Sequence, residues 1–258
     1  MVNDRRQISM LVASHKLYDM PGEEMYLPIW VGARLNAPKR FTPDDTGDNI
    51  SVKNRNFCEL TAVYWAWKNL EADNVGLCHY RRYFKGSFNF VAGGRSFGIL
   101  STEETLRLLE RHPVILPKKR DYYIETTYSQ YAHAHHAIDL DTARRILVDR
   151  HPGYVEAFDS LMKKTSGHKF NMFVMRKVIF DSYCNWLFDV LFEMEKRLDI
   201  SEYSVNDSRV FGFVAERLLD VWMETNSIDY CEVPVINLEN QHWVKKAFNF
   251  LKRKFAGR

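Results

Sequence analysis

The chain has 258 residues, of which 46% are hydrophobic and 27% are charged, and its formal net charge is +3. These values suit one large globular domain, and the small basic excess does not indicate a protein that binds nucleic acid. No run of about 18 uncharged apolar residues is present, and the N-terminus lacks the pattern of a signal peptide, so we expect no transmembrane helix and no secretion signal. The four cysteines form no Cys-x-x-Cys pair and are expected to be reduced core residues of a cytosolic protein.

The first half of the chain predicts strands separated by helices. Residues 8–13 form an apolar run typical of a buried strand, and residues 18–46, rich in Pro, Gly and charge, predict a loop with short elements. A helix is expected over 54–70, followed by a second strand that ends in His-Tyr-Arg-Arg. Ser101 and Glu104 have the spacing of a capping box and open a helix that runs to Arg111, and residues 113–117 predict a short strand.

The second half of the chain is richer in predicted helix. Residues 122–136 are expected to be irregular, and they are rich in Tyr and His. Helices are then expected near 141–149 and 154–163, at 178–198 and at 208–224, with strands at 170–175 and 230–236. This alternation of strands and helices predicts an α/β fold with a central, largely parallel sheet and a helix-rich C-terminal half.

The most informative segment is the end of the second predicted strand, His79-Tyr80-Arg81-Arg82. Ligands of open α/β sheets sit beyond the carboxyl ends of strands, and the planar guanidinium of Arg matches phosphate oxygens. Basic residues also follow the first strand (Lys16) and the 113–117 strand (Lys118 and Lys119), so these ends could converge into an anion pocket. The alternative is a surface strand end whose arginines pair with neighbouring carboxylates.

Several familiar motifs are missing from the sequence. There is no GxGxxG, no GxxxxGK[ST], no HExxH and no GxSxG, which argues against a dinucleotide dehydrogenase, a P-loop NTPase, a zinc protease and a serine hydrolase of the α/β type. The cluster His133-Ala134-His135-His136 could bind a metal, contact substrate or contain a partly buried, hydrogen-bonded His. Asp139-Leu140-Asp141 could hold a divalent cation against a diphosphate, or one of its aspartates could cap the next helix.

Three further segments each allow two interpretations. Residues 48–54 (DNISVKN) could form an Asx turn and cap a helix, or contact a base or ribose. Glu216 lies in a mostly apolar helix and could form a salt bridge with Arg217 or act as a general base. Residues 241–258 form a basic amphipathic helix pattern with no acidic residue, which could lie on an anionic membrane surface or dock on the domain.

The blocks DNISVKNRNFCELTAVYWAWKN, VGLCHYRRYF, FNMFVMRK, YCNWLFDVLFEMEKR and RVFGFVAERLLDVW resemble a family of bacterial capsular and exopolysaccharide glycosyltransferases. That family was long catalogued only as a domain of unknown function. The resemblance runs from about residue 8 to residue 222. It implies a Rossmann-like glycosyltransferase fold of the A type over residues 1–240, followed by the amphipathic helix 241–258. It also implies a peripheral enzyme at the cytoplasmic face of the cell membrane.

The resemblance further implies a UDP-sugar donor, such as UDP-galactofuranose, and a lipid-linked saccharide acceptor. No nucleic-acid partner is expected. No Asp-x-Asp follows a strand, so the arginines could take the place of a cation at the diphosphate, and the need for Mn²⁺ or Mg²⁺ stays open. The rival hypothesis is a non-catalytic, membrane-associated scaffolding protein of the polysaccharide machinery. The candidate residues are, for donor binding, Ser14, His15, Lys16, Asp48, Asn49, Lys53, Asn54, His79, Tyr80, Arg81, Arg82 and Lys118; for acceptor binding, Asn171 and His135; and for catalysis, Glu216 and His133.

Overall fold

A mixed sheet forms the centre of the molecule. The computed structural model describes residues 6–37 and 40–239. The main sheet has the strand order β11-β7-β10-β4-β1-β2-β3. Strand β1 pairs in parallel with both β4 and β2, whereas β10 runs antiparallel to β4 and β7. The strands are β1 (Arg6–Ser14), β2 (Tyr26–Trp30), β3 (Thr42–Pro43), β4 (Ala72–His79), β7 (Val114–Pro117), β10 (Phe173–Arg176) and β11 (Cys231–Val233).

A long curved hairpin extends from the sheet at the end of β4. It consists of β5 (Arg82–Ala92) and β6 (Arg95–Ile99), and β12 (Val235–Asn237) pairs with β5. A separate two-stranded ribbon joins β8 (Arg120–Asp121) to β9 (Ser166–Gly167). No strand was expected over the β5–β6 hairpin, because its alternating polar and apolar residues lie among Gly and Lys rather than in a continuous apolar run.

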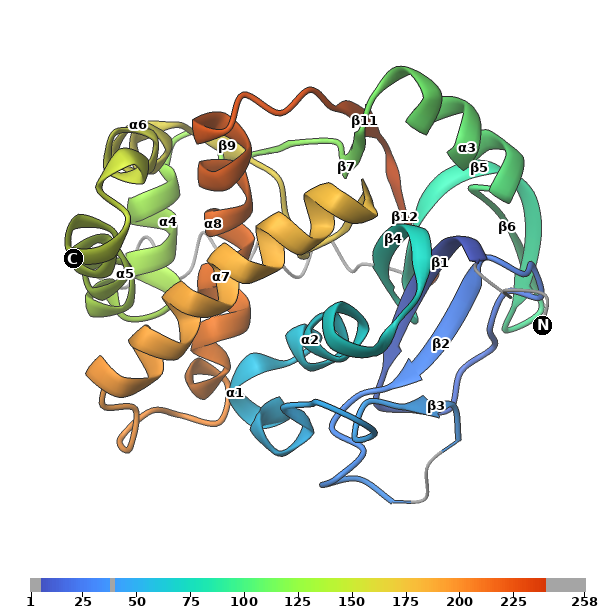
Figure 1. Cartoon of the computed structure of the whole chain (residues 1–258), viewed down its shortest axis with the longest axis horizontal. Helices are drawn as coiled ribbons and strands as arrows, with labels where there is room; N and C mark the ends of the chain where they lie inside the picture. Colours follow the sequence, from blue (N-terminus) through green and yellow to red (C-terminus); the bar gives the residue numbers. More distant parts are fainter. Residues whose placement is uncertain (1–5, 38–39, 240–258) are drawn as a thin grey trace.

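The helices gather mainly in one half of the molecule, beside the sheet (Figure 1). Helix α7 packs on β4, and α2 packs on β1. The alternation of side chains along β1 divides the interior into two clusters, with Leu11 and Ala13 facing the helices and Met10 and Val12 facing the hairpin side. The helices are α1 (Asn54–Phe57), α2 (Leu60–Asn69), α3 (Thr102–Arg111), α4 (Thr127–Ala134), α5 (Ala137–Arg150), α6 (Val155–Lys163), α7 (Lys177–Arg197) and α8 (Val210–Thr225), with 3-10 turns at Ser51–Lys53, Pro152–Tyr154 and Asp207–Arg209.

The structure confirms the α/β class, and it corrects several element boundaries. The helix expected over 54–70 is broken at Cys58, whose φ of 53° ends α1 before α2 begins. The segment expected to be irregular contains α4, which starts behind a Thr126 side-chain cap. The strand expected over 170–175 begins only at Phe173, since Phe170 and Asn171 have positive φ. The capping box of Ser101 and Glu104 is confirmed.

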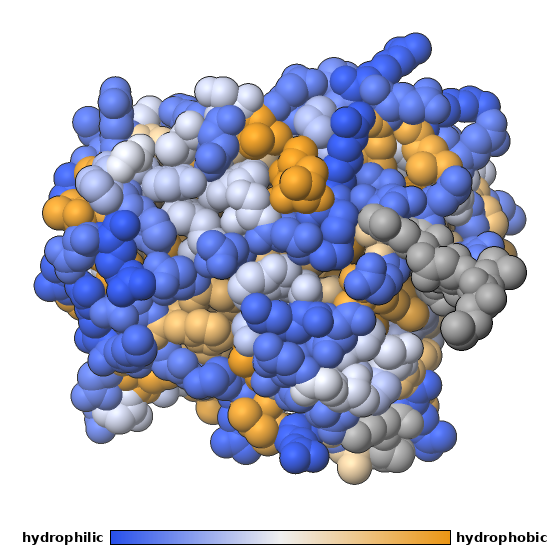
Figure 2. Space-filling model, viewed as in Figure 1, coloured by the Kyte–Doolittle hydropathy of each residue, from blue (hydrophilic) through white to orange (hydrophobic). Residues whose placement is uncertain are grey.

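The surface and the cysteines agree with a globular domain. Hydrophilic residues predominate on the face shown in Figure 2, with hydrophobic residues in small separate groups. Cys78 and Cys184 are buried, Cys58 and Cys231 are partly buried, and all four are free thiols. Within residues 6–37 and 40–239, no helix is long and apolar enough to span a membrane. The expected amphipathic helix 241–258 lies outside the described residues.

Candidate functional site

The His-Tyr-Arg-Arg segment forms a tight hairpin turn. His79, the last residue of β4, pairs with Arg82, the first residue of β5, so that Tyr80 and Arg81 make the turn between them. The Arg81 guanidinium lies 5.4 Å from the centre of the Tyr80 ring and donates to Glu239 at 2.9 Å. Burial and the neighbouring Arg81 lower the pKa of Arg82, and Glu216 and Glu59 oppose this effect. The turn therefore holds two guanidiniums close together beside carboxylates.

The end of β1 lies beside this turn, as the parallel pairing requires. The rings of His15 and Tyr80 meet edge to face at 5.5 Å. Burial, followed by Lys16 and Arg81, lowers the pKa of His15. Ser14 is buried, and its hydroxyl donates to the Lys16 carbonyl at 2.6 Å, which shapes the turn out of the strand. The predicted convergence of these two strand ends is confirmed.

The segment that precedes β10 closes over the same strand end. His79 Nε2 donates to the Phe170 carbonyl at 2.6 Å, and the Arg82 guanidinium lies 4.5 Å from the centre of the Phe170 ring. The Arg120 guanidinium lies 5.5 Å from the same ring. Phe170 has a φ of 76° and Asn171 a φ of 52°, a conformation that is costly for a bulky residue and is typical of functional sites. The third strand end thus reaches the site through Arg120, and Lys118 and Arg120 are both exposed to solvent.

Two carboxylates face this cluster from the helical half. Glu59 accepts a hydrogen bond from Asn171 Nδ2 at 2.7 Å, and the same amide donates to the Gly212 carbonyl in α8 at 3.0 Å. Burial lowers the pKa of His79, and both Glu59 and Glu216 act in the opposite direction, which places the two carboxylates near the imidazole. Sequence reasoning missed Glu59. Its signal was a carboxylate between the buried residues Phe57 and Leu60.

The Glu216 salt bridge expected as one of two interpretations is present. Glu216 accepts from Arg217 Nη1 at 2.9 Å, and Arg217 Nη2 donates to Gln130 in α4 at 3.0 Å. Arg217 is buried, so its charge needs these partners. Glu216 also acts on His79 and Arg82, as described above. Glu216 can therefore form its ion pair with Arg217 and still belong to the candidate site.

Lys169 adds a cation with an unusual environment. Its ammonium lies 4.6 Å from the centre of the Tyr122 ring. Burial, followed by Arg217, lowers the pKa of Lys169 to about 7. Four buried atoms of this region find no hydrogen-bond partner among the described residues: Arg82 Nε, Tyr122 Oη, Asn171 Oδ1 and Arg217 Nε. Buried polar atoms are normally paired, so such a concentration is typical of a site that receives a ligand or ordered water.

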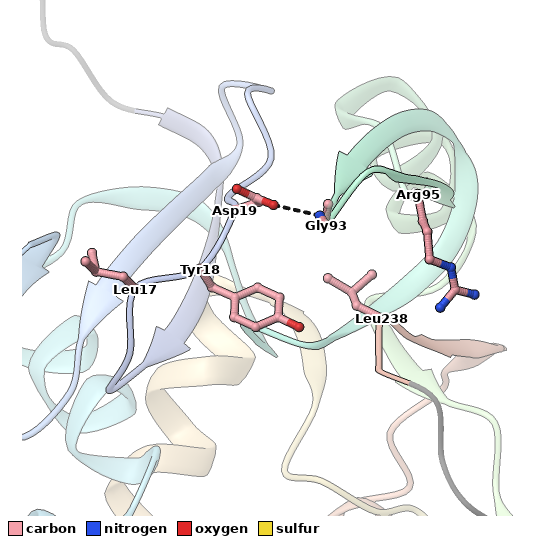
Figure 3. A pocket seen from close by; sticks show the side chains of 7 residues that line it. Leu17, Tyr18, Asp19, Gly93, Arg95 and Leu238 are labelled. Carbon is pink, nitrogen blue, oxygen red and sulfur yellow. Dashed lines mark hydrogen bonds between the residues drawn. The ribbon is translucent and has the colours of Figure 1, made fainter.

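A pocket of about 520 Å³ lies on the hairpin side of the strand ends. Figure 3 shows Tyr18 and Leu238 directed into it, with Arg95 on the hairpin and the Asp19 carboxylate accepting from the Gly93 backbone N–H at 2.8 Å. The Tyr18 ring meets the Tyr80 ring edge to face at 5.0 Å, so the pocket shares a wall with the turn after β4. The pocket offers an aromatic face and charged groups next to the two guanidiniums.

The predicted 48–54 loop makes contacts that stabilise the fold. Asp48 accepts from the Tyr64 hydroxyl at 3.2 Å, and the Asn49 amide donates to the Gly47 carbonyl at 2.9 Å. Lys53 forms an ion pair with Glu195 at 2.6 Å, and Asn54 donates to the Cys58 carbonyl at 2.7 Å. The Ser51 backbone N–H also donates to Asn49 Oδ1 at 3.2 Å, as in an Asx turn, but neither helix that starts at Ser51 or Asn54 has the predicted side-chain cap. A role in nucleotide binding stays a prediction.

The histidine cluster is arranged along the surface of the helical half. His133 pairs with Glu125 at 2.6 Å and is largely exposed. His135 pairs with Asp207 at 3.1 Å and stacks on Phe213 in α8. Glu216 thus acts electrostatically on His79 and Arg82 at the strand ends, while the ion pair of His133 is with Glu125. The catalytic and acceptor roles of these histidines remain predictions.

The expectation that an aspartate of Asp139-Leu140-Asp141 caps the next helix is wrong. Helix α5 begins at Ala137, with His136 in the cap position, so the aspartates lie inside the helix. Asp139 is buried and accepts from the hydroxyls of Tyr131 and Tyr203 at 2.7 and 2.6 Å. Within residues 6–37 and 40–239, no group of three or more His, Cys, Asp or Glu side chains is arranged to hold a metal ion. The donor set at the β4 turn is cationic, which suits anions rather than metals.

This architecture is similar to that of a protein with a known structure. A solved structure described as the WbbM bifunctional glycosyltransferase in its apo form matches with a TM-score of 0.82 and 30% sequence identity over 91% of this chain. The present chain spans about half of that longer protein, with 46% of it covered. No curated protein matches the chain. The family model described as a domain of unknown function, DUF4422, matches residues 9–227, most of the chain, and the protein therefore belongs to that family.

Proposed function

We propose that the protein is a glycosyltransferase that moves a sugar from a UDP-sugar to an acceptor in the synthesis of a bacterial surface polysaccharide. The observation that carries this proposal is the cationic cluster at the carboxyl ends of β1 and β4, in a fold shared with a glycosyltransferase at 30% identity. A departing nucleoside diphosphate needs its negative charge neutralised, and preorganised guanidiniums supply this neutralisation in a partly desolvated site.

Arg81 and Arg82 are suited to different parts of this task. The ion pair of Arg81 with Glu239 is solvent-exposed on both sides, so it holds Arg81 weakly and a diphosphate can replace the carboxylate. Arg82 is more buried, lies against the Phe170 ring and has an unpaired Nε atom. Arg82 is therefore the preorganised donor, and Arg81 is the adaptable one. Charge from Lys16 and Arg120 adds to the same potential.

Glu216 and Glu59 are the candidate bases for the acceptor hydroxyl. In an inverting transfer, the acceptor oxygen forms a bond to the anomeric carbon while the bond from that carbon to the diphosphate oxygen breaks. The bonding electrons leave with UDP, and the acceptor proton passes to a carboxylate. Asn171 holds Glu59 and Arg217 holds Glu216, and both carboxylates act electrostatically on Arg82. Glu216 is the residue that we assign to this role.

The proposal also covers the sugar that is transferred, the acceptor and the location of the reaction. Galactofuranose is the proposed sugar, a lipid-linked saccharide the proposed acceptor, and the cytoplasmic face of the membrane the proposed location. The basic pattern of residues 241–258 supports contact with anionic lipid. The Asn171 amide connects Glu59 in the α1–α2 break to α8. We therefore propose that Asn171 affects acceptor binding indirectly, because it positions the Glu59 carboxylate.

The test combines binding with turnover. Calorimetry measures UDP binding, and a coupled assay measures UDP release from several UDP-sugars, including UDP-galactofuranose, with a lipid-linked acceptor. Arg82→Ala is expected to lower kcat/KM by about 10²-fold or more, the usual effect of removing one charge-stabilising group. The matched control is Arg144→Ala, because Arg144 pairs with Asp159 on the surface of the helical half and is expected to leave turnover unchanged.

A scaffolding protein would behave differently in the same experiments. Wild-type protein that neither binds UDP nor releases it from any UDP-sugar would contradict the glycosyltransferase proposal. In cells, a scaffold predicts that Arg81→Ala leaves polysaccharide synthesis intact while deletion of residues 241–258 abolishes it. Glu216→Gln separates the catalytic proposal further, since we expect UDP binding to persist while turnover falls.

A further inference from the structure

One loop of the described chain exposes apolar side chains beside basic ones. Tyr123 is 88% exposed and Ile124 is 72% exposed, and one residue, Tyr122, separates them from Lys118-Lys119-Arg120-Asp121. Three cations and one carboxylate give residues 118–121 a net charge of +2. Single exposed apolar residues need no explanation, but two adjacent ones at the tip of a basic loop form the pattern of a surface that contacts lipid.

The backbone holds this tip away from the domain. The β8–β9 ribbon pairs Arg120 with Gly167 and Asp121 with Ser166, and the Tyr122 N–H donates to the Thr165 carbonyl at 2.7 Å. The Ile124 N–H then donates to the Tyr122 carbonyl at 2.8 Å, which closes a tight turn around Tyr123. Tyr123 has a φ of 61°, an unfavourable conformation for a bulky residue. The fold therefore maintains a strained turn that points an aromatic and an aliphatic side chain into solvent.

The tip lies at the same edge of the sheet as the candidate site. Strand β10 is antiparallel to both β4 and β7, so β7 runs in the direction of β4 and β1. The loop after β7 carries the tip, the turn after β4 carries Arg81 and Arg82, and the segment after β1 carries exposed Lys16 and Leu17, the latter 62% exposed. Arg120 and Arg82 both lie over the Phe170 ring, which links the base of the loop to the site.

We propose that the Lys118–Ile124 loop is a membrane-contact surface that inserts Tyr123 and Ile124 into the interface of an anionic bilayer and turns the strand-end site toward it. Tyrosine rings favour the interface because one end is apolar and the other is wet, and the cations attract anionic headgroups. Ile124 has no polar atom, which favours lipid over a saccharide as the partner. The inference does not depend on the proposed transferase activity.

The test measures binding of the full chain to vesicles by sedimentation. Vesicles contain phosphatidylcholine alone or a mixture with phosphatidylglycerol. Tyr123→Ser combined with Ile124→Ser is expected to lower partitioning into the mixed vesicles by about ten-fold or more, from the loss of two buried apolar side chains. The matched control is Val178→Ser combined with Val205→Ser, because these valines are 75% and 91% exposed on other elements. The control is expected to bind as the wild type does.

Three outcomes would overturn the inference. The loop variant could bind mixed vesicles as tightly as the wild type, which would leave residues 241–258 as the whole membrane contact. The control could lose binding equally, which would mean that no particular surface is used. Vesicle binding could persist while saccharide binding or turnover falls, which would assign Tyr123 to the acceptor instead. Loss of UDP binding by Arg82→Ala with intact vesicle binding keeps this test separate from that of the proposed function.

Discussion

At the residue scale, Asn171 and Lys169 decide how the candidate site is built. Asn171 lies in the left-handed region that Asn tolerates better than most residues, and its amide joins Glu59 to the Gly212 carbonyl. Burial, followed by Arg217, disfavours the charged form of Lys169 and lowers its pKa, although Glu216 and Asp220 oppose this effect, and the ammonium lies over the Tyr122 ring. The left-handed backbone of Asn171 and the buried ammonium of Lys169 each lower the stability of the fold. Such costs are typical of functional residues.

The pKa of Lys169 leads to a prediction about stability. Its pKa in the folded protein is about 7, below its ordinary value of 10.5, so between these pH values the unfolded chain holds more protons. The free energy of unfolding of the wild type, relative to Lys169→Met, should therefore rise from pH 7 to pH 10, by at most about 1.4 kcal/mol per pH unit. Denaturant unfolding at several pH values measures this difference. Lys163→Met, at an exposed position, should give a curve parallel to the wild type, and a parallel curve for Lys169→Met would contradict the prediction.

At the scale of elements, strand β4 connects the interior of the sheet to the candidate site. It lies between β1 and β10 and ends in the turn that carries Arg81 and Arg82. Gly76 lets the neighbouring strands approach closely, since a Cβ atom there would lie 2.6 Å from Met10 Sδ and 3.2 Å from the Phe173 carbonyl oxygen. The close packing of β4 therefore sets the position of the site as well as the stability of the core.

Gly76→Ala tests the role of this packing. The added methyl group has no space, and we expect the free energy of unfolding to fall by about 1–3 kcal/mol, the usual cost of overpacking a core. Chemical denaturation measures the change. Gly153→Ala is the matched control, because a Cβ atom there would meet nothing within 4 Å and φ is not in the left-handed region. An unchanged denaturation midpoint for Gly76→Ala would contradict the prediction, because it would mean that the Met10 side chain moves aside with no loss of stability.

At the scale of the whole molecule, the site lies where the sheet half meets the helical half. Glu216 comes from α8 and Glu59 from the break between α1 and α2. His79 and Arg82 come from the sheet, and Phe170 and Asn171 from the segment before β10. Hydrogen bonds tie the halves together there, among them Asn171 to Glu59 and His79 to the Phe170 carbonyl. A ligand bound in this position contacts both halves and should stabilise the complete fold.

Thermal unfolding with UDP follows from this arrangement. The proposed function requires UDP to bind the folded chain and not the unfolded one, so UDP at a hundred-fold excess over its Kd should add about 2.7 kcal/mol to the free energy of unfolding. The melting temperature should rise in one transition that includes both halves. Arg82→Ala should lose the shift, while Arg144→Ala should keep it. Uridine raising the melting temperature as much as UDP would contradict a role for the guanidiniums in holding the diphosphate.

Local sequence was enough to predict the strands that are continuous apolar runs, the capped helix after Ser101 and the basic end of β4, because these depend on residues close together in the chain. It also carried the family resemblance, and the family match confirms it. The place of Glu59 in the candidate site could not be predicted from the sequence, because its partner Asn171 is 112 positions away and only folding brings the two together. The same holds for the broken helix at Cys58 and for the strained Phe170–Asn171 segment, whose backbone angles are fixed by packing between the two halves rather than by local preference.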